Sequence, residues 1–203
     1  MANHDHLGKF TDSLFYPGAN NNATGTAALI ELCHAFNEAK KAGKGPKRSI
    51  LFVSTTGADA NSAGAWHYSS YPYVHLEDAV AAFDINGIGR TDTLHLTKGS
   101  NYTYILGASR TKPELKAALE AANNRYTKMG LDYTYDYPDE PNGYYSGSDL
   151  APLIEKNVAC IKIFGGENND SYKLTDASTQ TDPAQVERVT RLMFCTIWNL
   201  ANQ

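Results

Sequence analysis

The stretch AVAAFDINGIGR, residues 79–90, joins a short apolar run to a polar end that is rich in glycine. Residues 79–86 have the length and composition expected of one strand buried in a sheet. The four residues DING, 84–87, have the polar and turn-forming character that is common where a strand stops. This stretch therefore predicts a buried strand whose carboxyl end carries polar side chains.

Strands and helices are expected to alternate along the rest of the chain. The pattern predicts further strands over 49–57, 102–109 and 158–165, and helices over 23–41, 113–130, 149–157 and from Asp182-Pro183 onward. No linker rich in proline or serine divides the chain, so residues 1–203 are expected to form a single domain. The order predicts a three-layer α/β/α fold with a mostly parallel central sheet, whose ligand crevice lies beyond the carboxyl ends of the strands.

Charge and hydropathy exclude several classes of partner. The formal net charge is −4, and no polybasic surface for nucleic acid or anionic lipid is expected. No apolar run approaches the roughly 20 residues that a bilayer span needs, and the first residues, MANHDHLG, lack the apolar core of a signal peptide. We expect a soluble protein without a nucleic-acid or membrane partner, and the sequence gives no further indication of its localisation.

Polar segments gather where the expected strands end. They are NHDH (3–6), the three asparagines 20–22, TGADA (56–60) and DING (84–87). Each can be explained by itself as a turn or a cap; Asn22, for example, can accept from the first free N–H groups of the helix that follows. Four such segments in one crevice exceed what loops require, and together they predict a binding site.

Six motifs resemble the catalytic domain of the co-catalytic zinc exopeptidases, a family that includes bacterial leucyl aminopeptidases, glutamate carboxypeptidase and glutaminyl cyclases. In chain order they are ANHDHLG, GANNNATG, RSILFVSTTGAD, DINGIGR, GYYSGSDLAP and DSYKLTD. The resemblance covers essentially the whole chain, although the strand that precedes the first motif in the family is missing. It implies the fold of a zinc aminopeptidase.

The resemblance also implies which residues stand at the family's catalytic positions. In the family, two histidines, two aspartates and one glutamate hold two zinc ions, and a second glutamate is the general base. The resemblance places Asn3 and Tyr172 at the histidines, Asn21 at the bridging aspartate, Asn86 at the other aspartate, Asp59 at the ligand glutamate and Ala58 at the base. Asp84 stands where the family has asparagine, and Leu150 replaces a further histidine of the pocket.

Among the ligand positions only Asp59 keeps a good metal-binding group. Converging carboxylates are tolerable while divalent cations neutralise them, whereas amides can form hydrogen bonds to one another without metal. We therefore expect no cofactor, no bound zinc and no catalytic residue in the family's sense. The remaining candidates for a metal site are His4, His6 and Asp59, but strand alternation would direct residues 3 and 5 towards the pocket and residues 4 and 6 away from it.

Three functions are compatible with this pattern. The leading hypothesis is an aminopeptidase-inactive scaffold stripped of its metal site, and the loss of nearly every ligand within otherwise intact motifs favours engineering. A second hypothesis is a rebuilt pocket with a new metal site or a new hydrolytic activity, formed by Asp59, Asp84, Tyr172 or a nearby histidine. A third is a natural pseudoenzyme that binds a small molecule or peptide in the crevice.

Overall fold

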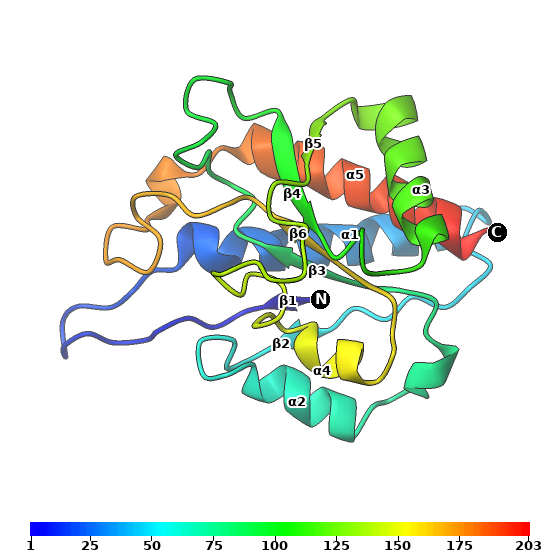
Figure 1. The fold of residues 1–203 in the computed structure, drawn as a ribbon, viewed down its shortest axis with the longest axis horizontal. Coiled ribbons are helices and arrows are strands. Elements are labelled where there is room, and N and C mark those ends of the chain that lie inside the picture. Colours follow the sequence, from blue (N-terminus) through cyan, green and yellow to red (C-terminus); the bar gives the residue numbers. More distant parts are fainter.

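The computed structural model, which describes residues 1–203, is organised around strand β3 (Ala82–Asn86). β3 pairs in parallel with β6 (Cys160–Phe164), which pairs antiparallel with β4 (Tyr102–Leu106), and β4 pairs in parallel with β5 (Gly130–Asp132). On its other side β3 meets β1 (Ala2–Asn3), where the N–H of Ile85 donates to the carbonyl of Met1 at 3.0 Å. β1 in turn pairs in parallel with β2 (Ser54–Thr55). The sheet is mostly parallel, as predicted (Figure 1).

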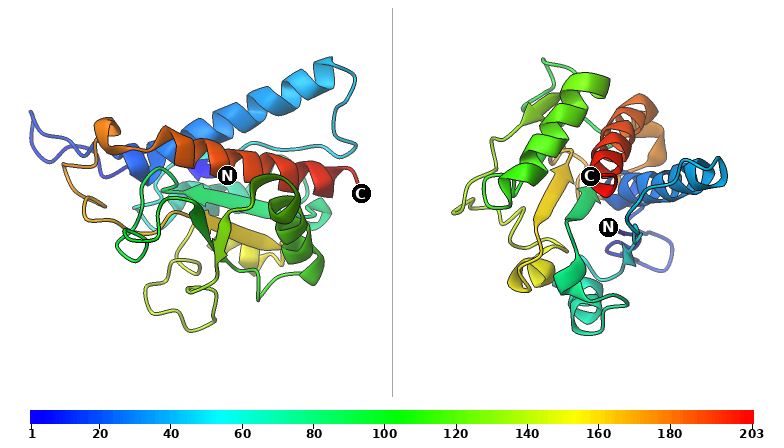
Figure 2. Two further views of the ribbon diagram at one scale, coloured as in Figure 1. Left: turned by 90° about the horizontal axis from the view of Figure 1, so that it is seen from above. Right: turned by 90° about the vertical axis from the view of Figure 1, so that its right-hand side faces the viewer.

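Helices cover both faces of this sheet. α1 (Thr24–Lys41), α3 (Pro113–Ala122) and α5 (Pro183–Ala201) lie on one face, with α5 packed against both of the others. The opposite face carries α2 (Ala63–Ser70) and α4 (Ala151–Glu155), as the right-hand view of Figure 2 shows. This is the expected three-layer α/β/α arrangement.

Side-chain alternation along the central strands produces two apolar cores. Ile85, Ile161 and Ile163 point into the larger core, which they share with residues of α1, α3 and α5. Their neighbours along β6, Cys160 and Phe164, point into a smaller core on the side of α4. Because both faces of the strands are buried, the near-continuous apolar character of these segments is explained.

The helix ends follow the expected chemistry in part. The side chain of Asp182 accepts a hydrogen bond from the N–H of Ala184 at 2.9 Å, which confirms the predicted start of α5. The helix expected over 113–130 is shorter, because α3 stops at Ala122 and a π-helical turn, Asn123–Thr127, follows. Asn123 stabilises this ending: its side-chain oxygen accepts from the N–H of Met129 at 2.8 Å.

The prediction of a strand over 49–57 is wrong in its extent, because only Ser54–Thr55 forms a strand. The N–H groups of residues 49–53 donate no backbone hydrogen bond, because β1 starts at Ala2 and no strand lies beside them. The other predicted strands are also shorter than expected, and each of their ends differs by three residues at most. α2 and β5 were not predicted from the sequence. The sequence of α2, AGAWHYSS, has no apolar stripe, and that of β5, GLD, is too short to show alternation.

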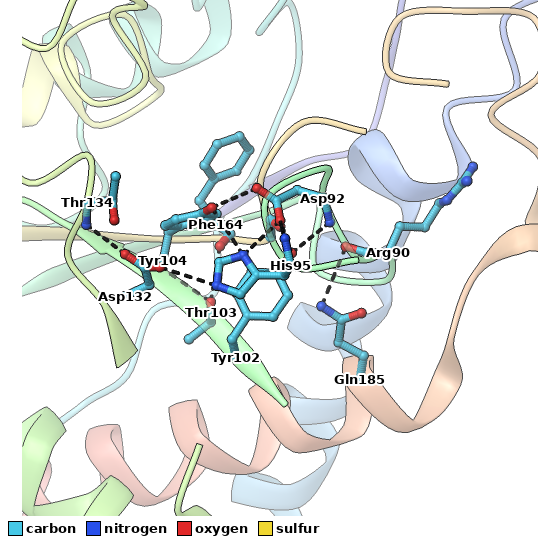
Figure 3. Close-up of polar contacts among 11 residues, drawn as sticks. Arg90, Asp92, His95, Tyr102, Thr103, Tyr104, Asp132, Thr134, Phe164 and Gln185 are labelled. Carbon is cyan, nitrogen blue, oxygen red and sulfur yellow. Dashed lines mark hydrogen bonds and ion pairs between the residues drawn. The ribbon is translucent and has the colours of Figure 1, made fainter. Parts of the chain in front are cut away.

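A buried polar network anchors the loop between β3 and β4 (Figure 3). The carboxylate of Asp92 accepts from the hydroxyl of Tyr104 at 2.6 Å and from that of Tyr102 at 3.1 Å, and it lies 2.8 Å from Nδ1 of His95. The other ring nitrogen of His95 lies 3.2 Å from Asp132, and its ring stacks on Tyr102. Every polar group of this network has a partner, so its role is to hold the loop against β4 and β5.

None of the helices combines the length and the apolar character that crossing a bilayer requires.

Replacing Asp92 by alanine is expected to lower the free energy of unfolding by about 2–4 kcal/mol, because two buried hydroxyls and an imidazole lose their shared acceptor. Urea denaturation followed by circular dichroism measures this value. The matched control is Asp139→Ala at an exposed carboxylate without hydrogen bonds, which should change stability by less than about 0.5 kcal/mol. Equal effects of the two substitutions would contradict the anchoring role.

Candidate functional site

The polar segments predicted to form a site meet at one end of the sheet, on the left in Figure 1. β1 ends there at Asn3 and β3 ends at Asn86. The start of α1 brings the three asparagines to the same place, and the loops that follow β2 and β6 bring Asp59 and Tyr172. The carboxyl ends of parallel strands thus converge at this crevice, as the fold class predicts.

Three amides form the floor of the crevice. The side-chain N–H of Asn22 donates to Oδ1 of Asn3 at 2.8 Å, and that of Asn86 lies 3.5 Å from the same oxygen. Asn22 also donates to the carbonyl of Ile85 at 2.9 Å. Asn3 and Asn22 are almost completely buried, so these bonds replace water with protein partners.

Asn22 in addition caps α1, as expected. Its side-chain oxygen accepts from the N–H of Gly25 at 3.2 Å and from that of Gly87 at 3.0 Å. The helix can come this close because position 25 is glycine: a Cβ there would lie 2.3 Å from the Asn22 side chain and from the carbonyl of Ile85. One amide therefore ties α1, β1 and β3 together.

Asn20 and Asn21 are held through a residue to which the sequence assigned no role. Asp176 is buried, and its carboxylate accepts from the backbone N–H of Asn20 at 3.0 Å and of Asn21 at 3.1 Å. The side-chain oxygen of Asn20 accepts from the N–H of Gly89 at 2.8 Å. Asp176 is the last residue of the DSYKLTD motif. Its place in that motif was the only signal in the sequence that it belongs to the site.

The wall of the crevice is an aromatic and acidic group. Nδ1 of His6 lies 3.0 Å from Oδ2 of Asp59, and its ring stacks on Tyr172 with 6.0 Å between centroids. The His6 side chain is 7% exposed, and its Nε2 is buried without a hydrogen-bond partner. Burial and the nearby carboxylates Glu167 and Asp59 raise the pKa of Tyr172, although a hydrogen bond with Asn21 opposes the shift. The phenol of Tyr172 is therefore neutral at physiological pH.

The two histidines of the first motif behave differently. His4 is exposed, and its Nδ1 lies 3.0 Å from the hydroxyl of Ser54, away from the crevice as expected. His6 does not point away, which corrects the expectation from strand alternation. The reason is that β1 ends at Asn3, so alternation stops before residue 6 and the chain turns His6 back towards Asp59.

Asp84 and Leu150 do not line the crevice. Asp84 is 2% exposed and lies 3.9 Å from Nζ of Lys162, its neighbour across β6. Burial raises the pKa of Asp84, while Lys162 opposes this shift. Leu150 is fully buried in the smaller core. Both side chains are buried inside the protein, so neither can contact a ligand in the crevice.

The carboxylate of Asp5, which also lies near the crevice, already has hydrogen-bond partners. Asp5 accepts from the hydroxyl of Thr56 at 2.6 Å and from the N–H of Gly57 at 2.7 Å. Burial tends to raise the pKa of Asp5, but these hydrogen bonds prevail and lower it. The structure contains no group of three or more histidine, cysteine, aspartate or glutamate side chains arranged to hold a metal ion.

Comparison with known proteins identifies relatives of this fold. Over its full length the chain superposes on BSAP, a zinc aminopeptidase from Bacillus subtilis, with a TM-score of 0.78 and 14% identity, and it covers 45% of that chain. A glutaminyl cyclase from Bacteroides thetaiotaomicron, bound to N-acetylhistamine, superposes on 98% of the chain with a TM-score of 0.68 and 16% identity, and 71% of that chain is covered.

Curated proteins match over shorter stretches. Rat transferrin receptor protein 2 (Rattus norvegicus) is 39% identical over 74 residues, which span 32% of this chain and 9% of the receptor. The putative zinc metalloprotease TRE2 of Saccharomyces cerevisiae is 24% identical over 171 residues, 83% of this chain and 19% of that protein. The chain therefore spans only a small part of each of these relatives.

The model of peptidase family M28 matches residues 1–197, almost the entire sequence. The chain belongs to peptidase family M28.

Proposed function

We propose that this chain is an M28 domain that lacks the two-zinc peptidase chemistry and binds a small molecule or peptide in its crevice. The observation that carries the proposal is the bonded set of Asn3, Asn22 and Asn86 at the strand ends. Two of these amides stand at positions where the family places zinc ligands. The amide of Asn3 already accepts from Asn22 and donates to the carbonyl of Asp5, and the side-chain nitrogen of Asn86 lies 3.5 Å from the same Asn3 oxygen.

The residues present do not fit the family's two zinc ions. Amide oxygen is a poor zinc ligand beside carboxylate or imidazole, and Oδ1 of Asn3 already accepts from Asn22. Asp59, the one acidic group at a ligand position, is paired with His6. The methyl group of Ala58 at the base position cannot accept a proton. Whether these exchanges arose by design or by natural loss makes no difference to this chemistry.

The same features suit a ligand that is neutral and rich in hydrogen-bonding groups. Asn21 and Tyr172 present an amide and a neutral phenol at the mouth of the crevice, and each can donate and accept. A relative with this fold, the glutaminyl cyclase, is described as bound to N-acetylhistamine, which carries an amide and an imidazole. This supports an amide-containing small molecule or a peptide as the ligand class.

A second candidate function rests on His6. Its Nδ1 is oriented by Asp59 while its Nε2 is unpartnered, which is the arrangement of a histidine held ready to accept a proton. Tyr172 covers the ring, and its backbone φ of 61° lies in the left-handed region, where a residue other than glycine is strained. If Tyr172 swings aside, His6 and Asp59 could act as an acid–base pair in ester hydrolysis.

The wild-type chain is expected to show no aminopeptidase turnover, with or without added zinc, because alanine stands at the family's base position, Ala58, and the zinc ligand set is missing. The assay measures release of a chromophore from leucyl p-nitroanilide at increasing zinc concentrations. A zinc-dependent rate above that of the buffer would contradict the proposed function. Thermal melts with and without a chelator serve as the control and should coincide.

Reversion at the family positions should restore a two-zinc site. The combined variant is Asn3→His, Asn21→Asp, Ala58→Glu, Asp59→Glu, Asn86→Asp and Tyr172→His. Calorimetry should show about two zinc ions bound per chain, and the metal-free variant should melt at a lower temperature than the wild type because the carboxylates repel one another.

The matched control for reversion retains Asn21 and carries the other five substitutions. Without the bridging carboxylate each ion is under-coordinated, so its zinc affinity should be at least about tenfold weaker. A folded sixfold variant that binds no zinc would show that these residues do not occupy the family's positions.

The second candidate predicts hydrolysis of p-nitrophenyl acetate that depends on His6. His6→Gln should lower the rate by about 10²-fold or more, since it removes the base. His4→Gln is the matched control, because His4 is exposed on the same segment, and it should leave the rate unchanged. Equal rates for the two variants would exclude an acid–base role for His6.

A further inference from the structure

A cavity of about 600 Å³ lies at the end of the sheet opposite the crevice. The crevice lies beyond the carboxyl ends of β3 and β6, whereas this cavity lies where β6 begins and where its antiparallel neighbour β4 ends. One wall consists of residues 110–112, which lead from β4 into α3, and another of residues 157–160, which lead from α4 into β6 (Figure 1). We call this cavity the arginine pocket, because Arg110 lines it.

Arg110 is held in place by its surroundings. Its N–H donates to the carbonyl of Gly107 at 3.1 Å, which closes a turn directly after β4. The carboxylate of Asp136 secures this turn, because it accepts from the N–H of Gly107 at 2.6 Å and from that of Ser109 at 2.8 Å. The guanidinium group lies over the buried ring of Tyr145, 4.4 Å from the ring centroid. The turn and the ring therefore fix the position of the charge.

The guanidinium group lacks hydrogen-bond acceptors. Its Nε and Nη2 atoms are buried and donate no hydrogen bond, although the side chain as a whole is 22% exposed. Asp136 offsets the charge in part, but its Oδ1 lies 3.9 Å from Nη2, too far for a hydrogen bond. The hydroxyl group of Thr111 is also buried and has no partner. Buried donors without acceptors cost free energy, and charged donors cost most, so an acceptor that enters the pocket would be stabilised.

The other residues of the arginine pocket define the kind of ligand that fits. Lys112 adds a second positive charge, and Glu155 is the single acidic residue of the lining. Ser146 and Asn157 can each donate a hydrogen bond. The volume lies in the range of small-molecule sites and exceeds what a bare ion would fill. Apolar side chains complete the lining: Ala151, Ile154, Val158 and Ala159.

We propose that the arginine pocket binds a small organic anion, whose carboxylate or phosphate group accepts hydrogen bonds from Arg110 and from Thr111. Nε and Nη2 lie on one side of the guanidinium group and can donate to two oxygens of the same anionic group. The apolar part of the ligand lies against Ile154 and Val158. A neutral ligand would leave the charged donors without a charged partner. The pocket shares no residue with the crevice, so this proposal does not depend on the proposed function.

Calorimetric titration of the full chain tests the ligand class. The probes are hexanoate and hexyl phosphate, which share an apolar chain and differ in their anionic group. At least one of them should show saturable binding, and the tighter one identifies the preferred group. Acetate and inorganic phosphate lack the apolar chain and should bind at least about tenfold more weakly.

Hexanol is the uncharged control and should show no measurable binding. Absence of binding by both six-carbon anions, or equal binding of hexanol, would overturn the proposal. Equal binding of the small anions would also overturn it, because the apolar wall would then contribute nothing.

Substitutions separate the donors of the pocket from its shape. Arg110→Met keeps an apolar chain over Tyr145 but removes the charged donors, so it should weaken binding of the tighter anion by about tenfold or more. Thr111→Val removes only the hydroxyl group and should weaken binding by about threefold. Melting curves check that both variants fold.

The matched control is Arg125→Met. Arg125 is exposed and lies over the ring of Tyr126, 5.2 Å from its centroid, so the control removes the same charge and the same kind of contact elsewhere. Its affinity for the anion should change by less than about twofold, because exposed charges are screened by solvent. Equal losses in the Arg110 and Arg125 variants would contradict recognition by Arg110.

Nuclear magnetic resonance of the unmodified chain gives a readout that depends on no substitution. Adding the tighter anion should shift the Nε–H signal of Arg110 and the backbone amides of Thr111 and Val158, and should leave the amide of Asn21 in the crevice unchanged. Shifts at Asn21 without shifts at Arg110 would place the anion in the crevice and overturn the proposal. Absence of any shift would overturn it as well, whereas a failure of the crevice to bind its own ligand would leave these results unaffected.

Discussion

The parallel pairing of β3 with β6 on one side, together with the hydrogen bond from Ile85 to Met1 beside β1 on the other, is the constraint on which the structure depends. These hydrogen bonds fix where each strand ends, and the strand ends place Asn86 and Asn3 within reach of Asn22. The same register sets Asp84 opposite Lys162, one step below the crevice. Because side chains alternate along β3, a shift of one residue would move Ile85 out of the larger core and Asn86 out of the site. The register of β3 therefore determines both which residues fill the core and which residues reach the site.

Neutral amides at the strand ends change the electrostatics of this crevice. Asp5, Asp59 and Asp176 already approach it, and each is held by hydrogen-bond donors of the chain itself. Further carboxylates would add repulsion without a cation to offset it, whereas amides donate as well as accept. This explains how the crevice can be closely packed and fully bonded around Asn22. Asp84, one step below the crevice, is buried with Lys162 3.9 Å away.

Much of the fold could be predicted from sequence because its strands are apolar on both faces and its helix caps are local. Asp182 and Asn22 cap as their positions indicate, through contacts within three residues. The extent of the strand at 49–57 could not be predicted, because pairing depends on a neighbour and not on the composition of the segment itself. In the site, the motifs indicated Asn3, Asn21 and Asn86, whose assignment to the family's ligand positions stays a prediction. The contact of His6 with Asp59 was missed, since it depends on where β1 stops.

β1 supports the crevice, although it has only two residues. Its Asn3 lies at the crevice and accepts a hydrogen bond from the side chain of Asn22. So short a strand gains little stability from its own backbone pairing. The bond between Asn22 and Asn3 and that between Thr26 and the Asn3 carbonyl therefore carry much of its attachment.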